Sequence, residues 1–577
     1  MPCSIGALFC CKASWFSVWS DDAVLRRPWR GLSRSLLVGA FAFPAVALAQ
    51  AVPDVGQVLR EQGGNRLEAP KVDELPFLAP PPAGAVGDGG PKLKLQAIRL
   101  TGAVALREAD LLGLVSDAYG KDLDYAGIRA LADRIVAYYH RHGFPFVNVY
   151  VPPQSVEGGV VSIRILEGRY GLIETRGAGN LPRESQPFLN GLHKGDLIRS
   201  AKLERSLLVL GDQPGIRITP YIQPGSELGV GDLVVAVRPD QRLAGMIGID
   251  NSGSRYTGQY RAMGGLEINS PLMLGDKLSL NGVLSDQMLW LGAASYELPL
   301  GHGGLRARFS YSHTRYDLGG EFTSLQAHGL ANVAGGDLEY PLLRSQNTNL
   351  RLQAGVQKKW LQNRYDAVGL DDRESSLAEH ATLRFDKRDK ILGGGVIYGG
   401  VSWWHGKLTI DPSMLLLDML TTRKAGVFNK WTLDVARLQR LPLGFGLYNR
   451  FSGQWSDRNL ESSERLALGG ADGVRAYPVG EGMGDTGWLV QSELRYGKGW
   501  LKPYVFFDVA RSRSNRFAWD AASDATRSIS GYGFGARINV RRCSLNALLS
   551  WPGVGGAPTA APGNFNPHWS SSLSCAL

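Results

Sequence analysis

Two charged residues, Arg475 and Asp508, lie in segments that carry few other charges and are candidates for a functional role. Arg475 lies in the glycine-flanked segment GVRAYP, and Asp508 lies in the alternating segment KPYVFFDVARS. Successive side chains of a strand point to opposite faces, so Asp508 shares a face with Phe506 while the opposite face is apolar. Spacing alone favours a solvated loop residue at Arg475 and an ordinary charge on a polar strand face at Asp508.

A glycine pattern follows Arg475 and resembles a phosphate-binding turn. Gly482-x-Gly484-x-x-Gly487 has the spacing of a dinucleotide fingerprint, but such a fingerprint opens a helix, whereas alternating residues follow here. We interpret these residues as loop glycines. The sequence has no Gly-x-x-x-x-Gly-Lys-Ser/Thr segment, and its nine histidines are scattered. We therefore predict no cofactor, no metal site and no enzymatic activity.

The five cysteines lie in two segments, one near each end of the chain. Of the five cysteines, Cys3, Cys10 and Cys11 precede residue 49, whereas Cys543 and Cys575 lie at equal distances on either side of position 559. If the last two strands form a hairpin centred there, these two cysteines face each other. A cross-strand disulfide and two free thiols fit the sequence equally well.

The N-terminal 49 residues have the features of an exported precursor. An apolar run at 36–49 ends in Ala-Leu-Ala, a small-x-small cleavage pattern, and arginines precede it. We predict a signal peptide at 1–49. Because its first part is long for such a segment, we expect translation to start near Val24 or Leu25.

The residues after the predicted cleavage site begin with one helix and a tether. Segment 53–63 places apolar residues at i, i+3 and i+4, which predicts a short amphipathic helix within region 50–64. Region 65–91 is rich in proline and glycine, as extended linkers are.

Two small α+β units follow the linker. Unit 92–168 reads as strand, helix, helix, strand, strand, with a single first strand at 93–102. Unit 169–242 repeats this pattern with one long helix and two final strands, so we expect two domains in series.

Alternation dominates the remaining 335 residues, 243–577. In segments such as 305–314 (LRARFSYSHT) one face is largely apolar and the other carries repeated Arg, Glu or Gln, over about ten residues, the length of a tilted membrane strand. Sixteen strands would leave about 21 residues for each strand with its loop. The net charge of +10 is spread along the chain without a Lys/Arg block, so we expect no nucleic-acid partner.

In combination and order, several stretches resemble the transporter (TpsB) family of two-partner secretion systems, the hemolysin activators and filamentous hemagglutinin exporters. They are LLVLGDQPGIRI, YIQPGSELG, DNSGSRYTGQYR, LEYPLLRSQNTNL, VRAYP and FFD. The resemblance implies a plug-like helix at 50–64, periplasmic POTRA domains at 92–168 and 169–242, and a transmembrane antiparallel β-barrel of 16 strands at 243–577.

The resemblance also implies roles for the two charged residues. In the family, the arginine of a Val-Arg-Gly-Tyr motif sits on a loop folded into the barrel and pairs with the aspartate of a Phe-x-Asp-x-Gly motif. The matching residues are Arg475, on a loop near 469–487, and Asp508, on a strand, with Val474, Tyr477 and Phe506 beside them. Ala476 and Ala510 stand where glycine is usual. In a water-filled lumen such a pair contributes only about 0 to 1 kcal/mol, so we expect it to position the loop.

The function implied is an outer-membrane pore that binds a TpsA-like exoprotein through its POTRA domains and secretes it without nucleotide. Outer-membrane lipid is the other expected partner. We expect Arg306, Arg308 and Arg351 to line a hydrated lumen. The alternatives are an insertase for outer-membrane barrels, which usually carries more POTRA domains, and a diffusion porin, for which such domains would be superfluous.

Overall fold

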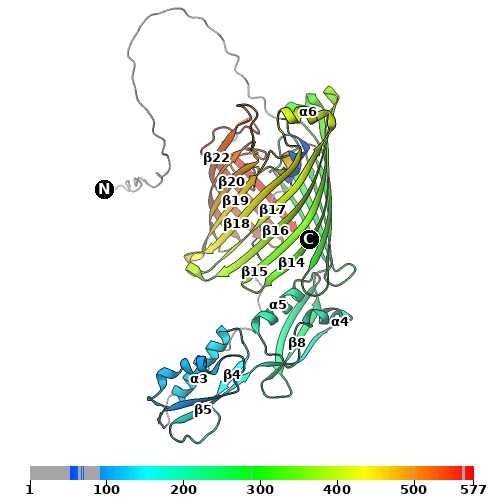
Figure 1. Ribbon diagram of the computed structural model, residues 1–577. Coiled ribbons are helices and arrows are strands. Elements are labelled where there is room, and N and C mark those ends of the chain that lie inside the picture. The colour runs from blue at the N-terminus through cyan, green and yellow to red at the C-terminus, as the bar shows by residue number, and fades with distance from the viewer. Residues whose placement is uncertain are drawn as a thin grey trace, which may run out of the picture. The chain divides into compact units, whose positions relative to one another are not determined.

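The computed structural model describes residues 52–62, 67, 69–70, 91–287, 289–497, 499–561 and 566–577. The predicted signal peptide and most of the predicted linker lie outside the described residues. Within the described part of the chain, no helix is long and apolar enough to cross a membrane. Figure 1 shows tilted strands side by side in a barrel wall and the smaller helix-and-sheet units before it in the chain.

The first small unit is built on a three-stranded sheet in the order β2-β5-β4 (Ala97–Thr101, Val160–Glu167 and Val147–Tyr150). Helices α2 (Glu108–Gly113) and α3 (Tyr125–Arg141) contribute apolar residues to the same core. The single strand expected at 93–102 is wrong. It divides into β1 (Leu93–Lys94), which pairs with β3 (Asp122–Leu123), and β2, which pairs in parallel with β5.

In this unit the carboxylate of Glu167 connects helix α3 to the loop after β2. Glu167 Oε1 accepts hydrogen bonds from the Tyr139 hydroxyl at 2.8 Å and from the backbone amides of Val104 and Ala105 at 2.9 and 2.8 Å. Burial, together with the hydrogen bond to the neighbouring carboxylate, raises the pKa of Tyr139. The contact fixes the C-terminal half of α3 against the end of β5.

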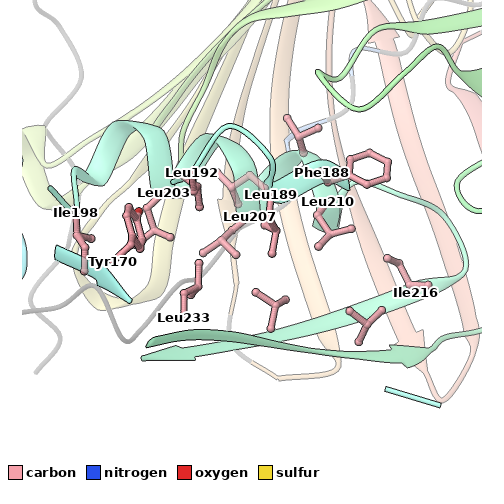
Figure 2. Packing of buried hydrophobic residues seen from close by; sticks show 14 residues of the cluster. Tyr170, Phe188, Leu189, Leu192, Ile198, Leu203, Leu207, Leu210, Ile216 and Leu233 are labelled. Carbon is pink, nitrogen blue, oxygen red and sulfur yellow. The ribbon is translucent and has the colours of Figure 1, made fainter. Parts of the chain in front are cut away.

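The second small unit has the sheet order β6-β8-β7 (Arg169–Gly177, Val230–Pro239 and Ile216–Pro224). Helix α5 (Ser200–Gly211) covers it through Leu203, Leu207 and Leu210, as Figure 2 shows. The sequence pattern missed the short helix α4 (Leu181–Ser185), whose five residues are too few for a helical period. In both units the two outer strands of the three-stranded sheet pair with another strand of that sheet on one edge only.

Sixteen antiparallel strands close into a barrel in which β24 pairs with β9. The number predicted from the resemblance is confirmed. The strands are β9 (Leu243–Asp250), β10 (Arg261–Asn269), β11 (Lys277–Ser285), β12 (Trp290–Pro299), β13 (Arg306–Asp317), β14 (Ala327–Arg344), β15 (Thr348–Tyr365), β16 (Leu370–Asp389), β17 (Gly395–Ile410), β18 (Gly426–Arg440), β19 (Phe445–Ser456), β20 (Thr486–Tyr496), β21 (Leu501–Arg513), β22 (Thr526–Val540), β23 (Cys543–Pro552) and β24 (His568–Ala576).

The wall alternates between an apolar outer face and a polar inner face. On β21, Val505 and Phe507 are exposed outward, whereas Phe506 and Asp508 are buried inside, as the alternation predicts. Outside, Trp431 lies directly opposite Trp403 on one neighbouring strand and Trp455 on the other. Such a row of tryptophans is typical of the lipid–water boundary of a membrane barrel.

The middle strands are longer than the ten residues expected. Strands β14 and β15 have 18 residues each and β16 has 20, well beyond the length that crosses a bilayer. Their ends define the two ends of the barrel. We call the end whose turns contact the second small unit the proximal end and the other the distal end. Helix α6 (Pro412–Leu420) lies in a distal loop.

Helix α1 (Val55–Gln62) lies inside the barrel near its distal end. Its first amide, on Val55, donates to Asn363 Oδ1 at 2.7 Å, and Arg261 Nη1 of β10 donates to Gln62 Oε1 at 3.2 Å. Asn363 is on the face of β15 opposite to the exposed Trp360, so the contact is internal. Val55 and Val58 are fully buried in a cluster with side chains from the wall.

Candidate functional site: a loop held inside the barrel

The segment between β19 and β20, residues 457–485, folds into the barrel. Val474, Ala476 and Tyr477 in this segment are buried completely. The expected loop at 469–487 extends slightly too far, because Thr486 and Gly487 already belong to β20. Tight turns shape its tip, where the Val474 amide donates to Leu468 O at 2.7 Å and the Gly470 amide donates to Tyr477 O at 3.0 Å. A Cβ at Gly473 would lie 2.1 Å from Leu468 O, so this turn requires glycine.

Arg475 at the loop tip binds Asp508 of β21 through two parallel hydrogen bonds. Its Nε is 2.8 Å from Oδ2, and its Nη2 is 2.6 Å from Oδ1. The Arg475 backbone amide also donates to Oδ2 at 3.1 Å. Two-point geometry of this kind is specific to arginine, because a lysine ammonium cannot present two fixed donors in one plane.

The pair is buried, which differs from the solvated arrangement expected from spacing. The side chains of Arg475 and Asp508 are 6% and 0% exposed. The guanidinium Cζ also lies 3.8 Å from the centroid of the Phe506 ring, close enough for a cation–π contact. The estimate of about 0 to 1 kcal/mol for an exposed pair therefore does not apply, since removing one partner of a buried pair costs about 3 to 5 kcal/mol.

Glu493 of β20 is a second carboxylate for Arg475, and the sequence interpretation missed it. It accepts from Arg475 Nη1, from Arg495 Nε at 2.6 Å and from Arg537 Nη2 at 3.1 Å. A signal was present, because Glu493 lies on the polar face of WLVQSELRY. The sequence could not identify Glu493 as the contact, because Gln491 and Arg495 lie on the same face. Spacing does not show which of the three side chains contacts the loop.

The backbone around Arg475 is tied to two further strands. Ser550 Oγ of β23 donates to Arg475 O at 3.1 Å, and His568 Nδ1 of β24 is 3.0 Å from the same oxygen. The Tyr477 hydroxyl donates to Gly556 O at 2.9 Å in the distal loop between those strands. The loop tip is thus fixed to strands β20, β21, β23 and β24 at once.

Ala476 is accommodated by a glycine on the wall. A Cβ at Gly531 of β22 would lie 2.5 Å from the Ala476 Cβ and 3.3 Å from Val474 Cγ1. The methyl group of Ala476 therefore fits because the wall residue opposite it has no side chain. Ala510, the second departure, is buried in the same apolar cluster as Val474 and Tyr477.

The loop also touches α1. Ser462 Oγ donates to Asp54 Oδ2 at 2.5 Å at the start of the helix. A Cβ at Gly56 would lie 1.8 Å from Glu461 Oε1, and a Cβ at Gly480 would lie 2.7 Å from Gln57 Nε2. Helix and loop therefore approach each other at glycines on both sides.

A polar cavity of about 550 Å³ lies between α1, the loop and the wall. Its basic lining residues are Arg60, Arg261, Lys359, Arg384, Lys430 and Arg450. Two of them converge on one carboxylate, since Lys359 and Lys430 both contact Glu464 of the loop. Among the described residues, no group of three or more His, Cys, Asp or Glu side chains is arranged to hold a metal ion.

The other residues singled out from the sequence lie at the proximal end. Cys543 and Cys575 are directly opposite each other on β23 and β24 and form a disulfide. Arg351 lines a second cavity. Arg306 and Arg308 both pair with Glu297, and their lining of the lumen stays a prediction.

The chain resembles known protein families and individual proteins. Residues 229–538 match the family described as haemolysin secretion/activation protein ShlB/FhaC/HecB, and residues 93–168 match the ShlB-type POTRA domain. The chain is 25% identical to the hemolysin transporter protein ShlB of Serratia marcescens over 87% of this chain and 89% of that protein. It is 24% identical to the heme/hemopexin transporter protein HuxB of Haemophilus influenzae, over 82% of this chain and 84% of that protein.

Solved structures agree at the level of fold. CdiB from Escherichia coli superposes with a TM-score of 0.67 at 21% identity, covering 87% of this chain and 93% of that one. CdiB from Acinetobacter baumannii gives a TM-score of 0.57 at 19% identity, covering 88% and 92%.

Proposed function

The chain belongs to the haemolysin secretion/activation protein family ShlB/FhaC/HecB, and from this premise we propose that it binds one partner exoprotein through its POTRA domains and secretes it. Its closed barrel is an outer-membrane transporter, and its POTRA domains, the two small units, lie in the periplasm, as in its relatives. The proximal end of the barrel is then periplasmic, and the distal end is extracellular.

Two features together carry the proposal. The sheets of the two POTRA domains have outer strand edges, and the barrel lumen is occupied. Strands β2 and β4 of the first POTRA sheet and β7 of the second each bond to a neighbour in their sheet on one edge only, whereas the outer edge of β6 is partly covered by residues 195–198. An extended segment that pairs with such an edge gains backbone hydrogen bonds with modest side-chain specificity. The partner recognised in this way is unfolded, as it must be to pass through a barrel.

The class of partner follows from the relatives. Their names describe a hemolysin transporter and a heme/hemopexin transporter. We propose that this chain secretes a large TpsA-like exoprotein of the hemolysin or adhesin kind.

Transport requires the lumen to be cleared of α1. The helix is eight residues long, shorter than the 12 to 15 or so that an isolated helix needs for stability, so it is built to be held by its surroundings. We propose that α1 leaves when the exoprotein enters, whereas the loop with Arg475 stays. The basic residues of the cavity then keep a hydrated passage for the moving chain.

Neither catalysis nor nucleotide is part of the proposal. The sequence has no nucleotide-binding segment of the Gly-x-x-x-x-Gly-Lys-Ser/Thr type. Folding of the exoprotein outside the cell would supply the direction. The apolar outer face, with its row of tryptophans, would contact outer-membrane lipid.

A deletion experiment tests the function. The gene is deleted, and large exoproteins, outer-membrane barrels and small-solute uptake are measured with and without complementation. We expect one exoprotein to disappear from the medium and to return on complementation, with other barrels normal. Loss of many barrels would favour an insertase instead, and loss of solute uptake alone would favour a porin.

A further inference from the structure

The joint between the second POTRA domain and the barrel accounts for two sequence motifs that the pore itself does not use. Asp212 lies in LLVLGDQPGIRI and Arg344 in LEYPLLRSQNTNL. Arg344, at the periplasmic end of β14, is 4% exposed. Its Nη2 is 2.7 Å from Asp212 Oδ1, and its Nε is 2.8 Å from Oδ2, so the pair is bidentate.

Arg344 is itself held in place from the barrel side. Its Nη1 donates to Asn349 Oδ1 at 3.1 Å, and Asn349 Nδ2 donates to Asp386 Oδ2 of β16 at 2.8 Å. The guanidinium therefore belongs to a network that spans strands β14, β15 and β16. Because Arg344 is fixed in this way, it also fixes the position of the Asp212 carboxylate that binds it.

The two residues after Asp212 contact two other parts of the barrel. Gln213 Oε1 accepts from Arg306 Nη1 of β13 at 3.0 Å, and Pro214 O accepts from Ser270 Oγ in the turn after β10 at 2.6 Å. Close packing accompanies these bonds, because a Cβ at Gly275 would lie 2.1 Å from Gln213 Oε1. Three consecutive residues are thus fixed by three different hairpins, which restrains rotation as well as translation.

This joint immediately precedes an outer strand of the second POTRA sheet and borders the lumen. Strand β7 begins at Ile216, and in its sheet it pairs with β8 alone. Asp212 and Arg344 line a cavity of about 580 Å³, together with inward-facing Arg351 and Arg384 of the barrel wall. The first residues of β7 therefore lie at the periplasmic entrance of the lumen.

We propose that Asp212 and Arg344 are positioning residues that hold the start of β7 at this entrance, so that a segment paired with β7 is delivered into the lumen. The proposal rests on the proposed function, because it concerns how the bound exoprotein is aligned. The pair does not contact the exoprotein's binding edge itself. Its loss should reduce delivery while leaving binding unchanged.

The test uses the full-length protein with Asp212→Asn, which changes a side chain outside the barrel strands, and Arg344→Lys, which keeps the charge but loses the two-point contact. The matched control is Lys202→Ala, which removes an exposed ion pair between α5 and Asp196 in the same domain and leaves both the joint and β7 intact. Spin labels at Thr219→Cys on β7 and Leu392→Cys on a periplasmic barrel turn report the distance across the joint by pulsed EPR.

For both joint variants we expect a broadened distance distribution, exoprotein secretion reduced about tenfold and an exoprotein Kd within about twofold of wild type. Lys202→Ala should match wild type in all three. Unchanged distance distributions, or normal secretion despite broadened ones, would overturn the proposal. The distance measurement needs no exoprotein, so it tests the joint even if the secretion function were wrong, and wild-type binding and secretion test that function separately.

Discussion

The lumen contains two occupants that are held in different ways. Helix α1 is held by separate hydrogen bonds, such as Val55 to Asn363, and by two buried valines. The loop tip is held by a buried, bidentate Arg475–Asp508 pair that Glu493 extends. A single hydrogen bond contributes about 1 kcal/mol, whereas breaking a buried ion pair costs about 3 to 5 kcal/mol. This difference supports the proposal that α1 is the removable occupant and the loop the permanent one.

The largest effect is expected from Arg475→Ala. The substitution leaves Asp508 buried without its partner and should release the loop tip, so we expect secretion to fall to background while barrel remains in the membrane. Heat-modifiable migration on gels measures the barrel, and exoprotein in the medium measures secretion. Asp508→Asn provides a second variant with a smaller volume change. Normal secretion by both variants would show that the pair does not hold the loop for transport.

A partial loss of secretion is expected from Gly531→Ala. The new Cβ would meet the Ala476 Cβ at 2.5 Å, and such overpacking costs about 1 to 3 kcal/mol. Adding Ala476→Gly should restore secretion, because it removes the other methyl group. If the double variant secretes no better than Gly531→Ala, the two residues are not in the contact described.

Gly56→Val should affect the helix rather than the loop. A Cβ at Gly56 would lie 1.8 Å from Glu461 Oε1 and 2.7 Å from Ser463 N, so α1 should leave its position. We expect higher ion conductance in planar bilayers, with secretion retained. Gly113→Val is the control, since no atom lies within 4 Å of its Cβ position. Equal conductance in the two variants would contradict the assignment of α1 as the removable occupant.

The smallest effect on secretion is expected from Cys543→Ser with Cys575→Ser. The disulfide joins β23 and β24 at the periplasmic end, away from both lumen occupants. Thermal unfolding should shift downward by the equivalent of about 2 to 4 kcal/mol with secretion unchanged. A loss of secretion in membranes that retain normal barrel would assign the bond a role in transport.

Strand periodicity predicted the wall well because it is a local property. The inward position of Asp508 follows from alternation with Val505 and Phe507, and the facing of Cys543 and Cys575 follows from hairpin symmetry. The same alternation could not reveal that the lumen around Asp508 is filled. That depends on the loop, whose path inside the barrel was implied only by resemblance.

Contacts between distant segments were the part that the sequence did not predict. On the barrel wall, Glu493 contacts Arg475 of the loop and Gly531 lies against Ala476. Nothing in the segments around Glu493 and Gly531 distinguishes these two residues from their neighbours. Alternation placed Arg306 on the lumen-facing side of its strand, but Arg306 bonds to the second POTRA domain. It lies at the end of its strand, where the neighbouring domain can reach it. Such partners are set by tertiary packing.

The most direct test locks each lumen occupant in turn. A short, reducible bis-thiol crosslinker would join α1 to the wall in Val55→Cys with Asn363→Cys. The same reagent would join the loop to the neighbouring extracellular loop in Glu481→Cys with Thr559→Cys, since each wild-type pair is in hydrogen-bond contact. Secretion is measured before and after reduction. We predict that the locked helix blocks secretion until the bond is reduced and that the locked loop secretes throughout. Secretion past a locked helix, or a block by the locked loop that reduction relieves, would contradict the account.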